Sequence, residues 1–333
     1  MDKIFAEMFA KQPDEIIGGD YFYHIPWLEN IFVEAVEHKG LWPYQWLKGE
    51  SNPFFYDPMA DVLKGANKDS EFEEMIGKIA HENKPFMDIA SSESMGLASY
   101  IVKLNPQIPC LVTDIDAHQM MTLRSCVDEH LTGYNINLAS FDNNHIPMKD
   151  NSLDYITSNN GIASSGGKPD VSKKANIYQF STGKEKVIAE VYRVLKPGGC
   201  YVAIESNREC DFDLRKIYDY HAEHGSLFGL YSYDEIQAVC GLLIEEPWRD
   251  KFTSAGFEIE IEKKHCRSYS LWEVMNFLHY FTRYHEIHHW EKENWEQQRR
   301  EENFTWNFDK NELGNIGMDL YDVDIFYVLR KPI

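Results

Sequence analysis

Three aspartates follow apolar runs in the middle of the chain. Asp88 ends the run "PFMD", Asp114 ends "CLVTD", and Asp142 comes directly after the alternating run Asn135–Phe141. An acid at the end of the second strand of a nucleotide-binding sheet can accept two hydrogen bonds from a ribose diol. A carboxylate or amide oxygen at the end of the next strand can accept a hydrogen bond from the exocyclic amine of a base. The three positions therefore predict a shared, nucleotide-like ligand.

Capping is the alternative interpretation for each of these acids, because aspartate commonly caps the turn or helix that follows a strand. Asp116, in "TDIDAHQ", also competes with Asp114 for the ribose. Three acids in the same position relative to three successive strands favour a ligand.

The segment "PFMDIASSESMG", which contains Asp88, has the outline of a nucleotide-binding turn. An apolar run is followed by small residues and then by a helical pattern. The small positions of a dinucleotide-type turn are glycines. Here they are Ala90, Ser92 and Ser94, and the glycine of the segment is Gly96.

A second group of residues could carry different chemistry. His285-Glu286-Ile287-His288-His289 matches the H-E-x-x-H motif. On a helix, His285 and His289 share one face, as zinc ligands do in metalloproteases, and Glu286 would be the base. Charged residues flank the motif and no glycine turn with a third histidine follows, so we expect no metal site. These histidines could instead face a substrate pocket, or be ordinary buried or solvated side chains.

The elements that position these residues alternate between strand and helix from Pro85 onward. The expected strands are 86–90, 110–115, 135–141, 153–158, 200–205, 257–263 and 324–330, and the expected helices are 97–104, 118–130 and 184–195. This alternation is typical of a parallel sheet with helices on both faces. Ligands of such sheets bind beyond the carboxyl ends of the strands.

Three segments lie outside the alternating strands and helices of the expected sheet. Residues 1–80 are rich in aromatic side chains, and we expect them to form a helical cap. Insertions are expected at about 206–245 and at about 265–318, the latter between the two last strands. One core of residues 81–333 with helical additions is the simplest organisation.

Two segments are similar to motifs of a known family. "DNNHIPMKDNSLDYITSN" resembles the D-x-x-x-L-P-F-x-D-x-S-F-D-x-V stretch of class I S-adenosylmethionine-dependent methyltransferases. "AEVYRVLKPGGCYVAIE" resembles the E-x-x-R-V-L-K-P-G-G segment of that family, with matches at Glu190, Arg193, Leu195, Lys196, Pro197, Gly198 and Gly199. "WRDKFTSAGFEIE" is similar to the helix, Ala-Gly-Phe turn and sixth strand that follow. The resemblance covers roughly residues 85–263 and the last strand.

The resemblance implies an α/β fold, a Rossmann-like sheet of seven strands, with S-adenosylmethionine bound across the strand ends. It implies that the cofactor is bordered by Asp88, Ala90 and Ser92, by Asp114 and Ile115 at the ribose, by Asp142 and Asn143 at the adenine, and by Asn159 and Asn160 near the methionine part.

The loop departs from the D-x-G-x-G-x-G pattern of the family, since Ala90, Ser92 and Ser94 replace its glycines. Glycine permits a positive φ and lets a ligand approach the backbone. Alanine and serine keep most of the room but cost roughly 1 kcal/mol for each strained residue. Serine hydroxyls can also donate to the cofactor carboxylate. We therefore expect cofactor binding to be weakened or reshaped.

Composition limits the partners. The chain has 54 acidic and 33 basic residues, a formal net charge of −21, and its field repels polyphosphates. We therefore expect neither a nucleic acid nor a membrane as partner. Six widely spaced cysteines without a C-x-x-C pair indicate reduced thiols, and no long apolar run occurs near the start. These features predict a cytoplasmic protein.

The sequence thus predicts methyl transfer from S-adenosylmethionine to a small-molecule acceptor. Displacement at a sulfonium methyl depends mainly on positioning, and oxygen acceptors also need a base. Glu205, at the end of the fifth strand, is a candidate base, although no catalytic residue is assigned. Aromatic side chains of the first segment can cover the sulfonium or form the core of the cap (Tyr21, Tyr23, Trp27, Trp42, Tyr44 and Trp46). The alternatives are an inactive binding protein of this fold and a metal-dependent hydrolase using His285 and His289.

Overall fold

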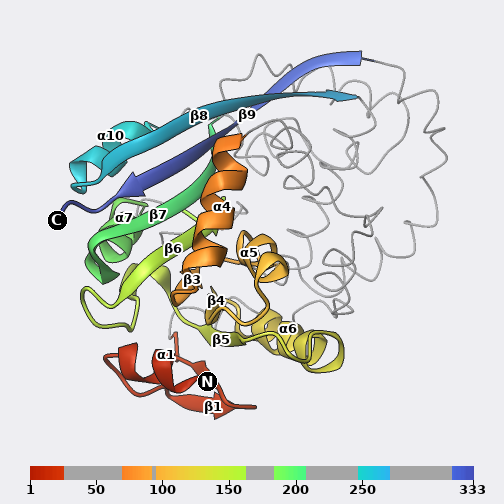
Figure 1. Cartoon of the computed structure of the whole chain (residues 1–333), viewed down its shortest axis with the longest axis vertical. Helices are drawn as coiled ribbons and strands as arrows, with labels where there is room; N and C mark the ends of the chain where they lie inside the picture. The colour runs from red at the N-terminus through yellow and green to blue at the C-terminus, as the bar shows by residue number, and fades with distance from the viewer. Residues whose placement is uncertain (26–69, 92–94, 163–183, 208–246, 271–316) are drawn as a thin grey trace, which may run out of the picture.

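The computed structural model describes residues 1–25, 70–91, 95–162, 184–207, 247–270 and 317–333 (Figure 1). Within these residues one sheet has the strand order β1-β2-β5-β4-β3-β6-β7-β9-β8. The strands are β1 (Glu15–Ile17), β2 (Asp20–Phe22), β3 (Phe86–Asp88), β4 (Cys110–Asp114), β5 (Ile136–Ser140), β6 (Leu153–Asn159), β7 (Leu195–Asn207), β8 (Glu258–Ser270) and β9 (Gly317–Arg330).

The part of the sheet from β5 to β8 is the predicted Rossmann-like sheet. Strands β5, β4, β3, β6 and β7 are parallel neighbours, and β9 lies antiparallel between β7 and β8. Along the chain, β4 and β5 are added on one side of β3, and β6 and β7 are then added on its other side. The strand order therefore switches between β3 and β6, where sheets of this kind bind ligands. The α/β fold class is confirmed.

The first residues of the chain differ from the expected helical cap. Helix α1 (Lys3–Met8) is followed by β1 and β2, which form an antiparallel pair, and β2 adds to the edge of β5 in parallel. Asp20 explains this docking, because its buried carboxylate accepts from both Nε and Nη2 of Arg124 and from the amide of Leu138 in β5. An otherwise open edge of the sheet is thereby paired. Residues 26–69 lie outside the described residues.

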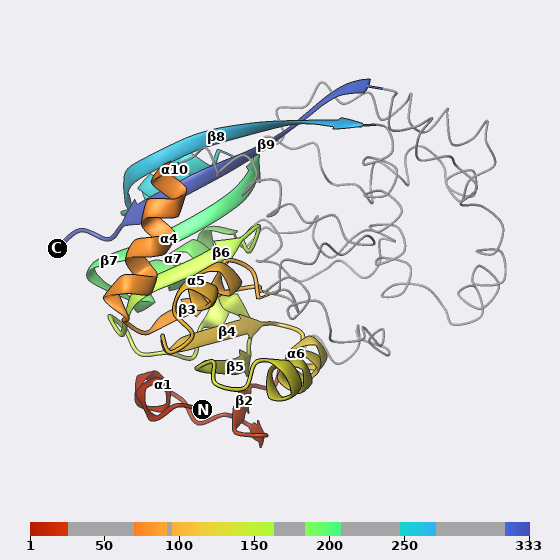
Figure 2. The ribbon, with the colours of Figure 1, turned by 45° about the vertical axis from the view of Figure 1, so that its right-hand side comes forward.

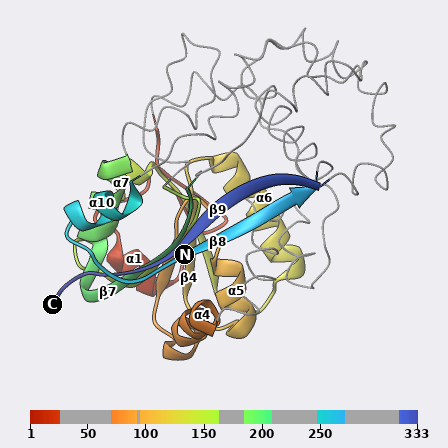
Figure 3. The same ribbon diagram turned by 90° about the horizontal axis from the view of Figure 1, so that it is seen from above.

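Helices cover both faces of the sheet, as Figure 3 shows from above. One face carries α4 (Ser70–Glu82), α5 (Ala98–Leu104) and α6 (Ala117–His130), and the other carries α1, α7 (Lys184–Val194) and α10 (Trp248–Ser254). Because α4 packs on the sheet, the helical layer already begins at Ser70. The other predicted domain boundaries stay predictions.

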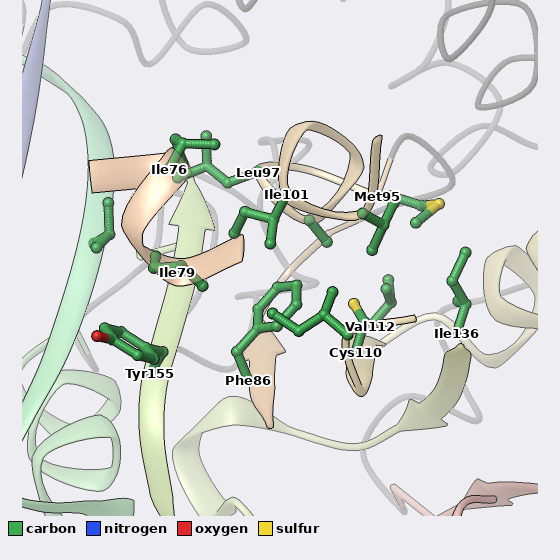
Figure 4. Packing of buried hydrophobic residues seen from close by; sticks show 14 of the residues in the cluster. Ile76, Ile79, Phe86, Met95, Leu97, Ile101, Cys110, Val112, Ile136 and Tyr155 are labelled. Carbon is green, nitrogen blue, oxygen red and sulfur yellow. The ribbon is translucent and has the colours of Figure 1, made fainter. Parts of the chain in front are cut away.

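The core on the α4 face is a continuous apolar layer (Figure 4). Phe86, Cys110 and Val112 point from the strands towards Ile79 of α4 and Ile101 of α5, and all five are buried. Each buried side chain of this size contributes about 1.5–3 kcal/mol through removal from water. This layer fixes β3 and β4 against the helices that follow them.

The opposite face is built from the alternate residues of the same strands, because successive side chains of a strand point to opposite sides. Tyr201 and Ala203 of β7 pack there with Trp248 and Phe252 of α10, whereas Val202 between them belongs to the α4 face. The sheet is therefore buried on both sides, which explains the nearly continuous apolar runs of its parallel strands.

The last two strands are neighbours in the sheet, and they are longer than predicted. Figures 1 and 2 show β8 and β9 side by side, and their register runs from Glu258 opposite Arg330 to Ser270 opposite Gly317. Residues 265–270 and 317–318, expected in the insertion, are thus strand. Residues 208–246 and 271–316, which hold most of both insertions, lie outside the described residues. Of the described helices, none has the length and apolarity that a membrane crossing requires.

Candidate functional site

The register of the parallel strands brings the predicted polar residues to one edge. Asp88 lies opposite Thr157 of β6, Asp114 lies opposite Ser140 of β5, and Asn159 lies opposite Ile204 of β7. Asp142 is the second residue after the end of β5, and Glu205 is the residue next to Ile204 in β7. The carboxyl edge around the switch between β3 and β6 therefore collects the acids and amides that the sequence indicated.

The Asp88 carboxyl group lies entirely inside the protein. The Thr157 hydroxyl donates to its Oδ2 at 2.5 Å, the Ser91 hydroxyl donates to its Oδ1, and the amides of Leu97 and Ala98 also donate to it. Burial raises the pKa of Asp88 to about 7, although these hydrogen bonds act in the opposite direction. The group thus ties the loop after β3 both to β6 and to the start of α5.

The loop after β3 has the backbone of a glycine turn without most of the glycines. Ala90, at the first glycine position of the family pattern, has φ +50°, and Met95 and Gly96 have φ +63° and +47°. A Cβ on Gly96 would overlap Oδ1 of Asp88, so this position requires glycine. Among the described residues of the loop, Ala90 and Met95 carry the cost of a left-handed backbone without glycine. Ser92 and Ser94 lie outside the described residues.

Hydroxyl groups connect the ends of neighbouring strands. Thr113 Oγ1 donates to the Asp88 carbonyl oxygen at 3.0 Å, and Ser140 Oγ donates to the Ile115 carbonyl oxygen at 3.1 Å. The amide of Ser91 donates to the Thr113 carbonyl oxygen at 2.9 Å. The backbone at this edge is therefore held by side-chain contacts beyond the ladder itself.

The predicted capping contacts exist at the acids after β4 and β5. The Asp114 carboxylate accepts from the amide of Asp116 at 3.0 Å, and Asp116 accepts from the amide of Gln119 at 3.3 Å at the start of α6. Asp142 caps the short 3-10 helix η2 (Asn143–His145) by accepting from the amide of Asn144 at 2.9 Å. A carboxylate has two oxygens with about four acceptor sites, so capping and ligand binding are compatible.

The loop after β6 is held by β7. Asn160 has φ +53°, and its amide donates to the Ile204 carbonyl oxygen at 2.6 Å. A Cβ on Gly161 would lie 2.7 Å from Ser158 Cβ and 2.9 Å from the Ile89 carbonyl oxygen. The loops after β3 and β6 therefore pack closely against each other at Gly161.

Three residues of the site were missed from sequence, namely Thr157, Ser158 and Tyr201. Thr157 bonds to Asp88 on the α5 face of the sheet, and Ser158 Oγ lies 2.6 Å from the Tyr201 hydroxyl on the other face. The signal for the first two was the polar pair Thr-Ser directly before Asn159 in "LDYITSN". Nothing in a strand rich in apolar residues distinguished Tyr201 from a core tyrosine.

The two family-like motifs contact each other. The Arg193 guanidinium donates to the carbonyl oxygens of Ile146 and Met148, each at 2.8 Å, and also pairs with Glu190. Glu190 Oε2 in turn accepts from the Ile146 amide at 2.9 Å. The Glu-x-x-Arg of α7 therefore binds the Ile-Pro-Met segment between β5 and β6.

The remaining candidate residues divide into two groups. Tyr21 and Tyr23 pack against Phe9, and Tyr23 also contacts Phe141, so these two partly buried tyrosines pack against the apolar core. The other four aromatic residues of the first segment and the H-E-x-x-H residues lie outside the described residues (Trp27, Trp42, Tyr44, Trp46, His285, Glu286 and His289). In the described part of the chain, no three His, Cys, Asp or Glu side chains are placed to hold a metal ion.

Comparison with known proteins decides the family. The model of the ubiE/COQ5 methyltransferase family matches residues 51–230, which is more than half of the chain. The chain belongs to the ubiE/COQ5 methyltransferase family. The matched residues contain the strands from β3 to β7 and hence the edge described above. The resemblance to class I S-adenosylmethionine-dependent methyltransferases is confirmed, and so is S-adenosylmethionine as the cofactor at the level of the family.

Curated relatives of the ubiE/COQ5 family match part of their own length. A demethylmenaquinone methyltransferase of Geobacillus stearothermophilus is 30% identical over 39% of this chain and 52% of the relative. A ubiquinone/menaquinone biosynthesis C-methyltransferase of Rickettsia prowazekii is 26% identical over 50% of this chain and 62% of the relative. The chain thus spans little more than half the length of these relatives. A solved methyltransferase structure from Bacillus halodurans has a TM-score of 0.45 and 14% identity, covering 78% of this chain and 99% of that one.

Proposed function

We propose that this protein transfers a methyl group from S-adenosylmethionine to a small-molecule acceptor. The observation that carries the proposal is the gathering of Asp88, Asp114, Asp142 and Asn159 at one edge of the sheet, on both sides of the switch in strand order. This edge lies within the region that matches the methyltransferase family.

The chemistry of the residues at this edge fits the cofactor. Asp114 would hold the ribose hydroxyls, because the two oxygens of a carboxylate can accept several hydrogen bonds besides the one from the Asp116 amide. Ile115 offers an apolar contact, and Asp142 and Asn143 offer polar groups for the adenine. Asn159 would lie near the methionine part. The left-handed backbone at Ala90 supports the proposal, because it keeps the loop after β3 in a glycine-like turn.

The bound cofactor supplies an electrophilic methyl group on a sulfonium. The residues of this chain then have to orient the acceptor in line with that methyl and keep water out, which are the main contributions of a protein to such a displacement. Ala90 and the Asp88 carboxyl shape the cofactor side of the site. Asp88 does so from the interior, because its carboxyl group already binds Ser91 and Thr157.

The acceptor is proposed to be a small molecule without a polyanionic part. A net charge of −21 disfavours polyanions. The curated relatives are named for demethylmenaquinone and for ubiquinone and menaquinone biosynthesis, so quinone-type rings are the first acceptors to test.

Calorimetric titration with S-adenosylmethionine and S-adenosylhomocysteine tests the cofactor part of the proposal. We expect micromolar binding by the wild type and its loss in Asp114→Ala. Asp128→Ala is the matched control, because this acid is exposed on α6 and pairs only with Arg124 among the ion pairs of the described residues. Absence of binding to the wild type, or binding by Asp114→Ala equal to that of the control, would contradict the proposal.

An inactive binding protein of the same fold is the second candidate function, and the replacement of the loop glycines by Ala90, Ser92 and Ser94 is the observation that favours it. A transfer assay with a labelled methyl group on the cofactor and quinone-type acceptors separates the two. Label in the acceptor supports the enzyme. Tight cofactor binding without transfer to any acceptor tested supports the binding protein.

A further inference from the structure

A buried polar cluster lies between β6 and β7 in the midst of apolar side chains. It consists of Ser158, Tyr201 and Glu205, none of which is exposed to solvent. Ser158 Oγ lies 2.6 Å from the Tyr201 hydroxyl and 3.4 Å from Glu205 Oε1. Burial of a carboxylate costs several kcal/mol unless hydrogen bonds compensate for the lost water. The hydrogen bonds of Glu205 therefore bear on its role.

Glu205 holds the loop that follows β6. The ladder between β6 and β7 ends at Asn159 opposite Ile204, and the Asn160 amide still bonds to the Ile204 carbonyl oxygen. The Ile162 amide then donates to Glu205 Oε1 at 3.1 Å. The side chain of Glu205 thus continues the backbone ladder by one further bond, which fixes both ends of Asn160–Ile162.

This loop also supports the loop after β3. Gly161 has no room for a Cβ because the Ile89 carbonyl oxygen lies against it, and the Ile89 amide donates to the Thr157 carbonyl oxygen at 2.9 Å. Any displacement of Gly161 therefore reaches the residue between Asp88 and Ala90. Asp88 secures the same edge on the α5 face of the sheet, whereas Glu205 acts on the α7 and α10 face.

We propose that Glu205 is a positioning residue that fixes the loop after β6, and through Gly161 the loop after β3, in the conformation that binds S-adenosylmethionine. The inference rests on the proposed function for the identity of the ligand. The role needs an acceptor oxygen for the Ile162 amide and does not need a proton transfer. It replaces the role of catalytic base considered from the sequence.

Two substitutions of Glu205 separate positioning from simple loss of stability. Glu205→Gln keeps a carbonyl oxygen that can accept from the Ile162 amide, and Glu205→Met keeps the length of the side chain without an acceptor. Ser158→Ala removes a neighbour of Glu205 and leaves the Ile162 bond in place. Val202→Ala is the control, because it creates a buried cavity in the same strand on the opposite face.

Hydrogen exchange of the peptide that contains Asn159–Ile162 measures the loop, and calorimetry with S-adenosylmethionine and S-adenosylhomocysteine measures the site. We expect faster exchange and at least about tenfold weaker binding of both ligands in Glu205→Met. Glu205→Gln should restore both within about threefold. Val202→Ala should lower the melting temperature without changing exchange of this peptide or affinity.

The outcomes separate this inference from the proposed function. If Glu205→Met binds both ligands as tightly as the wild type does, the inference is overturned and the proposed function stays intact. Equal losses in Glu205→Met and Val202→Ala also overturn it, because stability alone then explains both. If the wild type binds neither ligand, the proposed function fails. If hydrogen exchange is nevertheless faster in Glu205→Met, Glu205 holds the loop after β6, but the proposed effect of this loop on cofactor binding is overturned.

Discussion

The Thr157 hydroxyl donates a hydrogen bond to the Asp88 carboxyl group from the neighbouring strand, at 2.5 Å between Oγ1 and Oδ2. Both groups are fully buried, and this contact crosses the boundary at which the strand order switches. It joins the two halves of the sheet at the point where the ligand is expected. The protonation of Asp88 and the geometry of the loop are therefore coupled.

Thr157→Val should raise the pKa of Asp88 above its value of about 7. Valine preserves the shape of threonine but removes a donor that favours the ionised carboxyl group. We expect a loss of about 1–3 kcal/mol in stability as well, because a buried acceptor loses its partner. Carbon-13 NMR of the labelled aspartates measures the titration. A midpoint for Asp88 near 4 in the wild type would contradict the assignment.

Stability should fall between about pH 4 and pH 7 because of Asp88. The ordinary pKa of an aspartate carboxyl group is 3.8, and that of Asp88 in the folded protein is about 7, so the folded state retains a proton that the unfolded state has lost. The contribution of this group to stability is complete below about pH 4 and is lost as the pH rises through 7. A shift of about three units corresponds to ~4 kcal/mol. Urea unfolding across this range measures the slope, and Asp88→Asn should flatten it.

The sequence predicted the alternation of strands and helices and the edge of the site better than the state of the site residues. Asp88 and Asp114 were identified because each ends an apolar run, and Asn159 was identified through the resemblance to the methyltransferase motif. Parallel strands bring these positions to one edge. The environment of the Asp88 carboxyl group could not be predicted from the sequence, because it includes Thr157, which is 69 residues away in the chain. The sequence pattern around Asp88 contains no information on such a distant contact.

The strand β2 was missed for a similar reason. Its three residues carry too short a pattern for periodicity to show, and its position depends on the pairing of Asp20 with Arg124 on a distant helix. The helix expected at 184–195 was found almost unchanged as α7, because its apolar residues at helical spacing fill one face of the sheet.

Ala90→Gly should stabilise the protein by up to about 1 kcal/mol and should not weaken cofactor binding. Glycine relieves the strain at φ +50° and loses part of the gain to the greater freedom of the unfolded chain. Ala189→Gly, on the exposed side of α7, is the matched control and should destabilise by about 1 kcal/mol. Thermal unfolding measures both. Equal destabilisation by the two substitutions would show that position 90 carries no strain.

Gly161→Ala should weaken binding of S-adenosylmethionine by about tenfold or more. The added Cβ meets Ser158 and the Ile89 carbonyl oxygen at distances that force the two loops apart. Gly77→Ala in α4 is the control, because nothing lies within 4 Å of a Cβ there. That substitution should stabilise the helix by about 1 kcal/mol and leave the affinity unchanged. Calorimetry decides, and unchanged affinity in Gly161→Ala would mean that the loops are not in contact.

Arg193→Lys should destabilise the protein by about 2 kcal/mol or more despite keeping the positive charge. The planar guanidinium reaches the carbonyl oxygens of Ile146 and Met148 together with Glu190, and a lysine ammonium cannot reproduce this fork. Because Glu190 also accepts from the Ile146 amide, Glu190→Gln should cost less, since its amide oxygen can still accept. Urea unfolding compares the two. If Arg193→Lys were as stable as the wild type, the charge alone would join α7 to the segment before β6. The resemblance of both motifs to one family would then need a reason other than their mutual contact.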